Sequence, residues 1–373
     1  MSGFVYSEKP IDIERGEGPY LYSPDGTEYL DVGASYACTP LGHSHPAVVE
    51  AAQAQLDDLT FVQCSYPNPT RAALYDQLAD VTPSALEEVW LCNSGTEANE
   101  AAIKFARSAT GRTKVVSTMR AFHGRTMGSL ALTWKQKYRE PFEPVMPDVE
   151  FVPYGDADAL ADAVDEDTAA LFLEPVQGEG GVNPAEPAYL QAAREVTAEA
   201  GAALVFDEVQ TGVGRCGELW ACERAGVEPD VLTTAKGLAN GLPLGATVVA
   251  DWIADGAGPH GSTFSGGPVL AAAAGATLDT VIAEDLPANA AALGEYVREG
   301  ARDLDGVREV RGLGLMIGIE VRGGANPVVR DLAMDHQILA LPAGRTTVRL
   351  LPPLILDESH ADRFLDALAE VLE

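Results

Sequence analysis

Six short apolar runs constrain the fold of this chain more than any other feature of its sequence. They occupy residues 88–92, 113–117, 169–175, 202–208, 230–235 and 245–250. Runs of this length are typical of parallel strands buried between helices. From Ala98 to Ala109, apolar residues recur at the spacing of one helix face. The pattern predicts an α/β fold with a mostly parallel, doubly wound sheet in a large domain over residues 46–265.

The pattern changes after residue 265. Alanine-rich helices are expected at 268–283 and 285–304, followed by a strand pair within 307–321, a strand within 346–354 and a last amphipathic helix from Glu358. Residues 18–31 are typical of a hairpin with a Pro-Asp-Gly turn. We expect a smaller α+β domain over residues 266–373, completed by the N-terminal segment 1–45.

The net charge narrows the possible partners. The chain carries 56 acidic and 25 basic residues, a net charge of −31, whereas a small domain has a charge of magnitude roughly 2–8. Such a surface repels nucleic acid and anionic lipid, and it requires salt to screen its own repulsion. We therefore expect a protein of a halophilic host without nucleic-acid or membrane partners. An acidic mesophilic protein is the alternative.

Two further observations concern the compartment. No apolar run approaches the roughly 18 residues of a spanning helix, and residues 1–16 lack the apolar core of a signal peptide. The five cysteines are odd in number and lack paired spacing, which indicates free thiols in a reducing compartment. The sequence predicts a cytoplasmic protein without a metal site.

A single lysine within residues 233–246 raises the main chemical question. The chain has six lysines, and Lys236 is the only one after Lys137. It stands among apolar and glycine residues without an acidic neighbour. Lysine is almost never buried without a partner, and burial lowers its pKa toward a neutral, nucleophilic amine. Schiff-base chemistry requires a lysine in that condition.

Two strand ends offer further polar groups. Ser94, Gly95 and Thr96 lie at a turn between a strand and a helix, where free N–H groups and hydroxyls form an anion site suited to phosphate. An ordinary N-cap by Thr96 is the alternative. Asp207 ends the buried run 202–208 and requires a cationic partner. A protonated ring nitrogen would suit it, and a salt bridge to Arg215 is the alternative.

Residues 120–128 add aromatic rings and a cation. Phe122 and His123 supply flat rings that could lie over an aromatic cofactor, although each alone is more often structural. Arg125 could bind a carboxylate with two hydrogen bonds. A phosphate site, an acid for a ring nitrogen, a stacking ring and a deprotonatable lysine are the four features that pyridoxal phosphate needs.

Seven segments resemble, in order, the motif series of the class III (subgroup II) pyridoxal-phosphate aminotransferases. They begin at residues 93, 122, 174, 207, 235, 260 and 311, and the resemblance extends from about residue 20 to 353. It implies a fold-type I transferase. The likeness is greatest to the acetylornithine aminotransferase group, and residues 124–142 are similar to the branch whose substrates are attached to an amino-group carrier protein of the LysW type.

The resemblance implies cofactor contacts for nine residues. Lys236 forms the Schiff base and moves a proton between the two reacting carbons, and Asp207 pairs with the pyridine nitrogen. Phe122 stacks on the exposed face of the ring. The remaining implied contacts come from Gly95, Thr96, Glu208, Val209, Gln210 and, from the neighbouring subunit of a homodimer, Thr263.

The resemblance also implies two half-reactions at one site, with glutamate or 2-oxoglutarate and with an ω-semialdehyde substrate. Arg349 binds the α-carboxylate of glutamate, and Glu179 pairs with Arg349 when the ω-amino substrate is bound. Arg125 receives the carboxylate end of an acyl-ornithine-like substrate, and Ser262 lies near it. An ω-aminotransferase of arginine or lysine biosynthesis is implied. Free N-acetylornithine as substrate, another class III chemistry such as an aminomutase or decarboxylase, and a non-catalytic cofactor-binding protein are the alternatives.

One segment has an unusual local charge. Between residues 112 and 139 there is no acidic residue, although the whole chain is strongly acidic. We hypothesise that part of this segment forms a positive rim that receives an acidic carrier protein. The alternative is that the charges are scattered over several faces. The seven cations are Arg112, Lys114, Arg120, Arg125, Lys135, Lys137 and Arg139.

Overall fold

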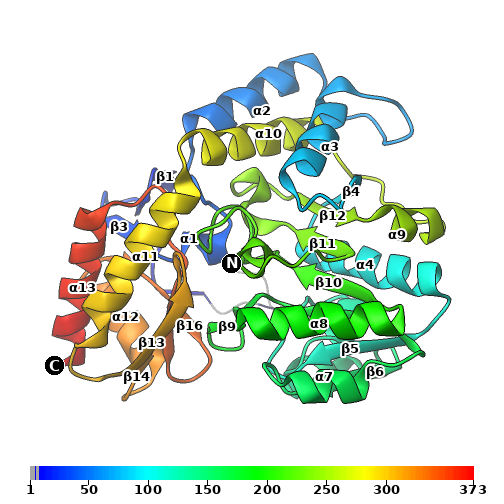
Figure 1. Cartoon of the computed structure of the whole chain (residues 1–373). Coiled ribbons are helices and arrows are strands. Elements are labelled where there is room, and N and C mark those ends of the chain that lie inside the picture. Colours follow the sequence, from blue (N-terminus) through cyan, green and yellow to red (C-terminus); the bar gives the residue numbers. More distant parts are fainter. Residues whose placement is uncertain (1–4, 6–7) are drawn as a thin grey trace.

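The predicted sheet is the centre of the structure. A computed structural model describes residue 5 and residues 8–373 (Figure 1). The expectation about a signal peptide in residues 1–16 therefore falls partly on residues outside this range. The sheet has seven strands in the order β4-β12-β11-β10-β7-β5-β6. They are β4 (Glu88–Cys92), β5 (Lys114–Thr118), β6 (Val149–Val152), β7 (Thr168–Leu173), β10 (Ala203–Asp207), β11 (Val231–Thr234) and β12 (Gly245–Val249).

All six predicted runs are strands of this sheet, but one differs in direction. β12 pairs antiparallel with both β11 and β4, whereas the other five neighbouring strands, from β11 to β6, run parallel. Only ten residues, 235–244, connect β11 to β12, which is too short for the crossover that parallel strands need. β6 is an additional edge strand that the apolar runs did not indicate.

Alternate residues of the central strands pack into two separate layers. Phe172, Val205 and Val231 face a cluster that includes the apolar side of α4, while Leu171 and Leu204 face the cluster that includes α8. This period of two is the geometry of a strand covered on both faces. The helices around the sheet are α4 (Gly95–Thr110), α5 (Met127–Ala131), α6 (Gln136–Arg139), α7 (Ala157–Ala163), α8 (Pro187–Ala200) and α9 (Asp251–Gly256).

The C-terminal part forms a second sheet with its own helices. β13 (Val307–Leu313), β14 (Met316–Val321), β17 (Thr347–Leu350) and β16 (Leu341–Ala343) form an antiparallel sheet in the order β13-β14-β17-β16. α11 (Leu286–Arg302), α12 (Ala325–Asp335) and α13 (Glu358–Leu372) lie beside it in Figure 1. The expected helices and strands of this region are therefore present.

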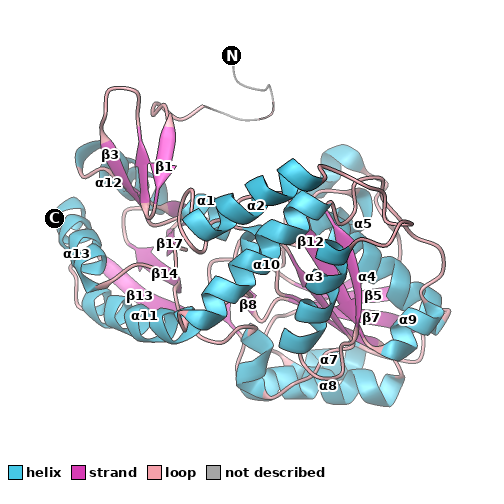
Figure 2. Cartoon of the chain, turned by 90° about the horizontal axis from the view of Figure 1, so that it is seen from above, coloured by secondary structure: helices cyan, strands magenta, loops and turns pink. Residues whose placement is uncertain are grey.

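The N-terminal strands join the C-terminal part of the chain. β1 (Arg15–Glu17), β2 (Tyr20–Tyr22) and β3 (Glu28–Asp31) form a meander that contains the expected hairpin, and β15 (Ile338–Leu339) pairs parallel with β3. α10 (Pro268–Ala283) instead packs along α2 (Pro46–Asp58) and α3 (Pro69–Val81), as Figure 2 shows. The domain boundaries at residues 45 and 265 stay a prediction. No helix in the described part of the chain is long and apolar enough to cross a membrane.

Candidate active site

A cavity of about 520 Å³ opens at the carboxyl ends of the parallel strands. This is the edge of an open α/β sheet at which ligands bind. β10 ends at Asp207, and Glu174 and Lys236 closely follow β7 and β11. Nine of the residues proposed from the sequence line the cavity together: Gly95, Thr96, Phe122, Arg125, Glu179, Asp207, Val209, Gln210 and Lys236.

The N-terminus of α4 borders this cavity. The Ser94 side chain caps the helix by accepting the Glu97 N–H at 3.3 Å, so the alternative of an N-cap at Thr96 is wrong. The N–H groups of Gly95 and Thr96 precede the intrahelical hydrogen bonds and can bind an anion. A Cβ at position 95 would lie 2.7 Å from the Val209 side chain, so glycine allows the turn to approach the strand end closely.

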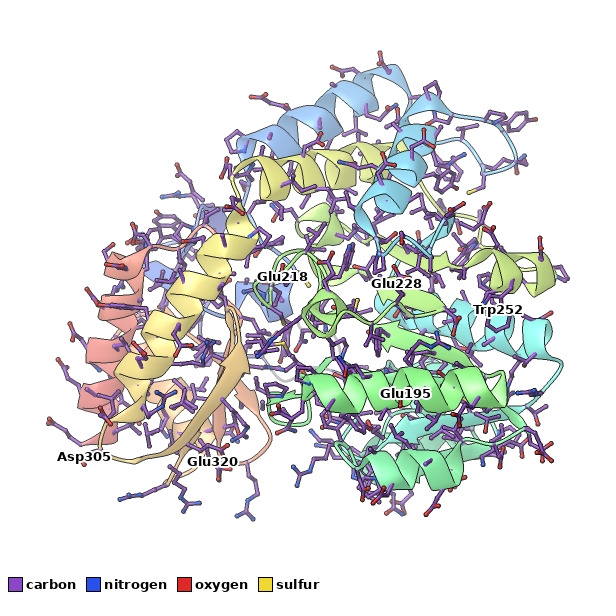
Figure 3. The ribbon with its side chains drawn as sticks, in the orientation of Figure 1. Glu195, Glu218, Glu228, Trp252, Asp305 and Glu320 are labelled. Carbon is purple, nitrogen blue, oxygen red and sulfur yellow. The ribbon has the colours of Figure 1, made fainter. Side chains whose placement is uncertain are left out.

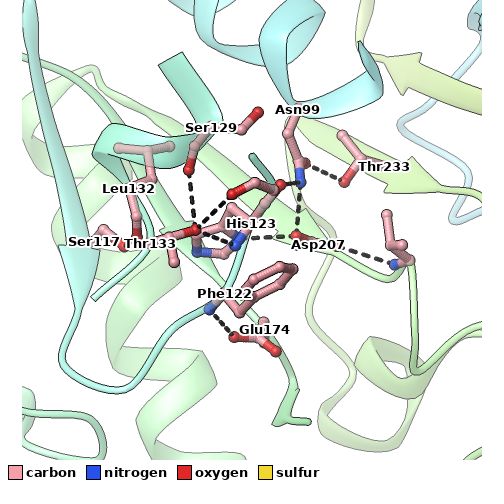
Figure 4. Close-up of polar contacts among 12 residues, drawn as sticks. Asn99, Ser117, Phe122, His123, Ser129, Leu132, Thr133, Glu174, Asp207 and Thr233 are labelled. Atoms are coloured by element: carbon pink, nitrogen blue, oxygen red, sulfur yellow. Dashed lines mark hydrogen bonds and ion pairs between the residues drawn. The ribbon is translucent and has the colours of Figure 1, made fainter. Parts of the chain in front are cut away.

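Asp207 is held by donors on three sides (Figure 4). Its Oδ2 atom accepts the Asn99 amide at 2.8 Å and lies 2.7 Å from Nδ1 of His123, while Oδ1 accepts the Val209 N–H at 3.0 Å. Thr233 donates to Asn99 at 2.8 Å and thereby orients its amide toward Asp207. Because these groups donate to an ionised carboxylate, the arrangement favours a negative charge at the cavity wall.

Two interpretations of this region are corrected by the geometry. Arg215 does not pair with Asp207: its guanidinium donates to the carbonyls of Leu315 and Pro352. The His123 ring is buried and bonded to Asp207. Unlike Phe122, it is therefore not placed to lie over an aromatic cofactor. Burial alone would lower the pKa of His123, but the hydrogen bond and charge of Asp207 outweigh it and raise that pKa.

Lys236 combines an unusual backbone with a perturbed amine. It begins the 3-10 helix η3 (Lys236–Ala239) with a φ of 42°, a conformation that L-residues rarely adopt outside functional sites. Its side chain is partly exposed and lines the cavity. Burial lowers the pKa of the amine, although the charges of Glu179 and Asp207 act in the opposite direction. The result is an amine that loses its proton more easily than a surface lysine.

Arg349 and Glu179 form an ion pair next to the cavity. Arg349 lies on β17 and is fully buried, and its Nη2 atom is 2.7 Å from Oε1 of Glu179. Its Nη1 atom donates to Oε1 of Gln210 at 3.2 Å. Burial alone would raise the pKa of Glu179, but Arg349 outweighs burial and lowers it. The Nε atom of Arg349 has no hydrogen-bond acceptor within the described residues.

Tyr36 lies over this ion pair on a strained segment. The segment labelled α1 (Ala34–Ala37) has four successive residues with φ between 41° and 68°, which makes it a left-handed turn. Each such residue costs roughly 1–2 kcal/mol. The Tyr36 ring is 5.6 Å from the Arg349 guanidinium carbon. Strain of this kind persists only where the surroundings hold it, and here it lies beside Arg349.

Phe122 and Arg125 follow β5 at the opposite wall. The Phe122 ring is partly buried, and the Arg125 guanidinium lies 5.7 Å from that ring and 4.0 Å from the ring of Tyr138. Arg125 is exposed, lines the cavity and is oriented by these two rings. It can therefore meet a carboxylate that enters from solvent.

Besides Arg349, which contacts the cavity-lining Glu179 and Gln210, three residues proposed from the sequence do not line the cavity. Glu208 is fully buried behind it, where its carboxylate accepts the Thr211 hydroxyl and the Cys222 N–H. Ser262 accepts the Asn93 amide at 3.4 Å, and Thr263 is exposed in the same turn. Within one copy of the described chain, none of the three lines the cavity.

Asn99 and Glu174 line the cavity but were not found from the sequence. Glu174 accepts the Phe122 N–H and the Gly178 N–H, and burial raises its pKa to about 7. It immediately follows strand residues 168–173, and the argument used for Asp207, a carboxylate at the end of a buried strand, would have identified it. Asn99 carries no comparable signal.

Comparisons with known proteins agree with this geometry. The aminotransferase class-III profile matches residues 4–372. An acetylornithine aminotransferase of Mycolicibacterium smegmatis is 47% identical over 99% of this chain and 95% of its own. A [LysW]-aminoadipate semialdehyde transaminase of Deinococcus radiodurans is 44% identical over 99% of this chain and 87% of its own.

The fold has close neighbours among solved structures. An ornithine aminotransferase from Toxoplasma gondii, whose structure reveals partial occupancy of PLP at its active site, superposes with a TM-score of 0.93 at 32% identity, covering 98% of this chain and 91% of its own. The chain therefore belongs to the class III aminotransferases, and it is an aminotransferase that depends on pyridoxal phosphate.

Proposed function

We propose that this aminotransferase exchanges an amino group between glutamate or 2-oxoglutarate and the terminal semialdehyde of a glutamate or aminoadipate carried by an acidic protein of the LysW type. The observation that carries the proposal is a basic rim made of Arg125, which lines the cavity, Lys135, which contacts the cavity-lining Glu179, and the neighbouring Arg120 and Lys137. None of the four forms an ion pair with a residue of the described chain. In a protein of net charge −31, unpaired cations at the active site favour an acidic partner.

Six of the seven cations between residues 112 and 139 divide into two groups, and the seventh, Arg139, lies over the Phe151 ring at 4.9 Å. Lys114 begins β5 and pairs with Glu150 and Asp165, and Arg112 donates to carbonyls such as that of Thr168, which begins β7. Both therefore stabilise the amino edge of the sheet, away from the cavity. The basic rim lies at the carboxyl edge: Lys135 donates to the Glu179 carbonyl at 3.1 Å. Only this second group supports the carrier proposal.

The cavity fits pyridoxal phosphate. When bound, the cofactor supplies an electron sink that stabilises a carbanion next to the amino group. Lys236 would hold it covalently, Asp207 would keep its ring nitrogen protonated, and Phe122 would stack on its ring. Oδ1 of Asp207 faces one N–H, that of Val209, and can accept a second donor. The phosphate would lie against Gly95 and Thr96, with Val209 beneath the ring and Gln210 at its phenolic oxygen.

Lys236 would move the proton that transamination requires. Its lowered pKa favours the neutral amine, so the Nζ atom can accept a proton from one carbon and return it to another. The left-handed backbone at this residue fixes the origin of the side chain. Asp207 would support this step by stabilising the positive charge of the protonated ring nitrogen.

The Glu179–Arg349 pair supports two substrates in one site. Glutamate brings an α-carboxylate, for which Arg349 would be released from Glu179. An ω-amine brings no carboxylate near its reacting carbon, so Glu179 would keep Arg349 neutralised. The unsatisfied Nε donor of Arg349 is available to a substrate carboxylate. Arg125 would hold the distal carboxylate of the second substrate, with Ser262 close to it.

The relatives leave the acyl group of that substrate open, since one is named for acetylornithine and the other for a carrier-linked semialdehyde. Free N-acetylornithine is therefore the alternative substrate. The Glu179–Arg349 pair favours a dual-substrate transaminase over an aminomutase or decarboxylase, neither of which requires 2-oxoglutarate.

A second copy of the chain would complete the site. Thr263 is exposed, and its neighbour Phe264 is 65% exposed, with its ring tilted against that of Phe61 at a centroid distance of 5.3 Å. Tyr66 is 59% exposed. Exposed aromatic groups of this kind are typical of an interface. In a homodimer they would be covered, and Thr263 of one copy would reach the phosphate in the other.

The acidic surface supports a halophilic, cytoplasmic setting. Side chains such as Glu195, Glu218, Glu228 and Asp305 are exposed on separate elements (Figure 3). Charges of one sign dispersed over a whole surface keep a protein soluble but repel each other unless salt screens them. We expect maximal stability and activity at high ionic strength.

Single-turnover spectroscopy in high salt tests the proposed function. The protein is purified with its cofactor, and glutamate, N-acetylornithine and carrier-linked ornithine or lysine are added separately. The proposal expects glutamate to convert the visible absorbance of the lysine-bound cofactor, and a carrier-linked amine to do so much faster than N-acetylornithine. Equal or faster conversion by N-acetylornithine would favour the free substrate. No conversion by glutamate would contradict the dual-substrate site.

A further inference from the structure

Glu174 connects two loops on opposite sides of the cavity. Its side chain is buried, at 6% exposure, directly after β7. Oε1 accepts the N–H of Phe122 at 2.9 Å, as Figure 4 shows, and Oε2 accepts the N–H of Gly178 at 3.0 Å. Phe122 belongs to the loop after β5, and Gly178 begins the turn between β8 (Val176–Gln177) and β9 (Asn183–Pro184). One carboxylate therefore binds the backbone of both loops.

We propose that Glu174 is a positioning residue that fixes the distance between the Phe122 ring and the Glu179 carboxylate, and so decides how firmly Glu179 stays on Arg349. The inference rests on the proposed function for the roles of Phe122, Glu179 and Arg349. The hydrogen bonds from which it is drawn are independent of those roles.

An ionised carboxylate suits this position because it only accepts hydrogen bonds. A protonated carboxyl or a carboxamide would turn one donor toward one of the two N–H groups and release that loop. Gly178 lies against the Gln210 side chain, since a Cβ at that position would lie 1.9 Å from Oε1 of Gln210. We expect a released turn to move away from this contact, and Glu179, the next residue, to move with it away from Arg349.

The charge state of Glu174 changes near neutral pH. Burial raises its pKa to about 7; His123 lowers it and Asp207 raises it. Tyr154 donates to the Glu174 backbone carbonyl at 2.8 Å, and the charged groups Arg125, Glu179 and Lys236 line the same cavity as Glu174. Below about pH 7 the carboxyl is protonated and holds one loop less firmly. The preference for an ω-amine over glutamate should therefore decrease as the pH falls through this value.

The test compares Glu174→Gln with Tyr154→Phe in the holoenzyme. Tyr154→Phe removes hydrogen bonds to the carbonyls of Glu174 and Pro175 but leaves the carboxylate intact, so it controls for general loosening. Backbone hydrogen exchange is measured in peptides that cover Phe122 and Gly178. The ratio of kcat/KM for the ω-amine to that for glutamate is measured from pH 6 to 9.

Glu174→Gln should speed exchange in at least one of the two peptides. It should lower the ratio about tenfold or more above pH 7, since a hydrogen bond to a charged group is worth roughly that factor. The inflection near pH 7 should disappear in Glu174→Gln and remain in Tyr154→Phe. If Glu174→Gln does not fold, Glu174→Asp keeps the charge, is one methylene shorter and should also release one loop.

Unchanged exchange at both N–H groups would overturn the inference, and so would equal effects of Glu174→Gln and Tyr154→Phe. If the wild-type protein does not use an ω-amine, the proposed function fails. The exchange measurement then decides alone whether Glu174 holds the two loops.

Discussion

His123 and Asp207 form a buried pair in the wall of the active-site cavity, with Nδ1 of the histidine 2.7 Å from Oδ2 of the aspartate. Both side chains are almost completely shielded from solvent. The Asn99 amide donates to the same oxygen, so two donors stabilise the carboxylate at Oδ2. The hydrogen bonds of His123 and Asn99 stabilise the negative charge of Asp207 at a strand end that is shielded from solvent.

Replacing His123 by glutamine should destabilise the protein in a pH-dependent manner. The pKa of His123 is raised above its ordinary value of 6.5 in the folded state, so its contribution is fully present below pH 6.5 and is lost as pH rises through the folded value. Breaking a buried pair costs about 3–5 kcal/mol. Denaturant unfolding at pH 6 and pH 9 should show a larger difference from wild type at pH 6. A difference that grows with pH would contradict this assignment.

Replacing Lys236 by alanine should abolish turnover and weaken retention of the cofactor. Removal of a positioned general base alone lowers a rate by roughly 10²–10⁴-fold, and loss of the covalent attachment adds to this effect. Activity and the visible absorbance are measured after dialysis. Lys104→Ala is the matched control, because Lys104 is exposed and does not line the cavity. Wild-type turnover by Lys236→Ala would remove the basis of the proposed chemistry.

Changes to the Glu179–Arg349 pair should affect the two half-reactions differently. Arg349→Lys loses the planar guanidinium, and we expect its kcat/KM for glutamate to fall about tenfold or more, with a smaller effect on the ω-amine. Glu179→Gln removes the competing carboxylate and should lower the KM for glutamate while raising it for the ω-amine. Equal changes in both half-reactions would mean that the pair is only structural.

The exposed aromatic group at Phe264 tests the homodimer. Phe264→Arg should shift the protein toward a monomer in size-exclusion chromatography with light scattering, and it should weaken cofactor binding if Thr263 of the second copy holds the phosphate. Phe142→Arg is the matched control, since Phe142 is 60% exposed against 65% for Phe264 and lies outside the cavity. If Phe264→Arg leaves the molecular mass unchanged, the interface lies elsewhere, and if both variants lower the mass, the effect is not specific to Phe264.

The sequence identified the strands better than their directions. An apolar run reports burial, so the six central runs were found, whereas β6 escaped because its residues alternate in exposure at the edge of the sheet. The direction of β12 depends on the length of its connection to β11, and an apolar run carries no such information. Reading the ten-residue connection 235–244 as too short for a crossover would have corrected it.

In the site, too, single residues were recognisable from their local sequence, whereas contacts between separate elements were not. Asp207 and Lys236 were recognisable because a charged residue next to a buried strand is unusual in the sequence itself. Their partners come from other elements: His123 follows β5, and Asn99 lies on α4. No spacing in the sequence pairs His123 with Asp207 or excludes Arg215, since both depend on how separate strands align in the sheet.

The basic rim provides the test of the carrier. Lys135 is unsuitable for charge reversal because its amine donates to the Glu179 carbonyl, and its loss would disturb the cavity directly. Lys137 is exposed, and its amine contacts only the Tyr138 ring, at 4.9 Å, among the interactions found in the described chain. Lys137→Glu should raise the KM for a carrier-linked substrate several-fold, an effect that shrinks as salt increases.

The same variant should leave the KM for free N-acetylornithine unchanged, because that substrate would reach Arg125 in the cavity but not Lys137, which does not line it. Arg322→Glu is the matched control: Arg322 is exposed, forms no ion pair with the residues that the structure describes, and does not line the cavity. If Lys137→Glu raises the KM for the carrier-linked substrate only, and Arg322→Glu changes neither KM, the rim is a docking site for the carrier protein. If both substrates respond equally, the charge acts on the cavity, and a free acylated amine becomes the better-supported substrate.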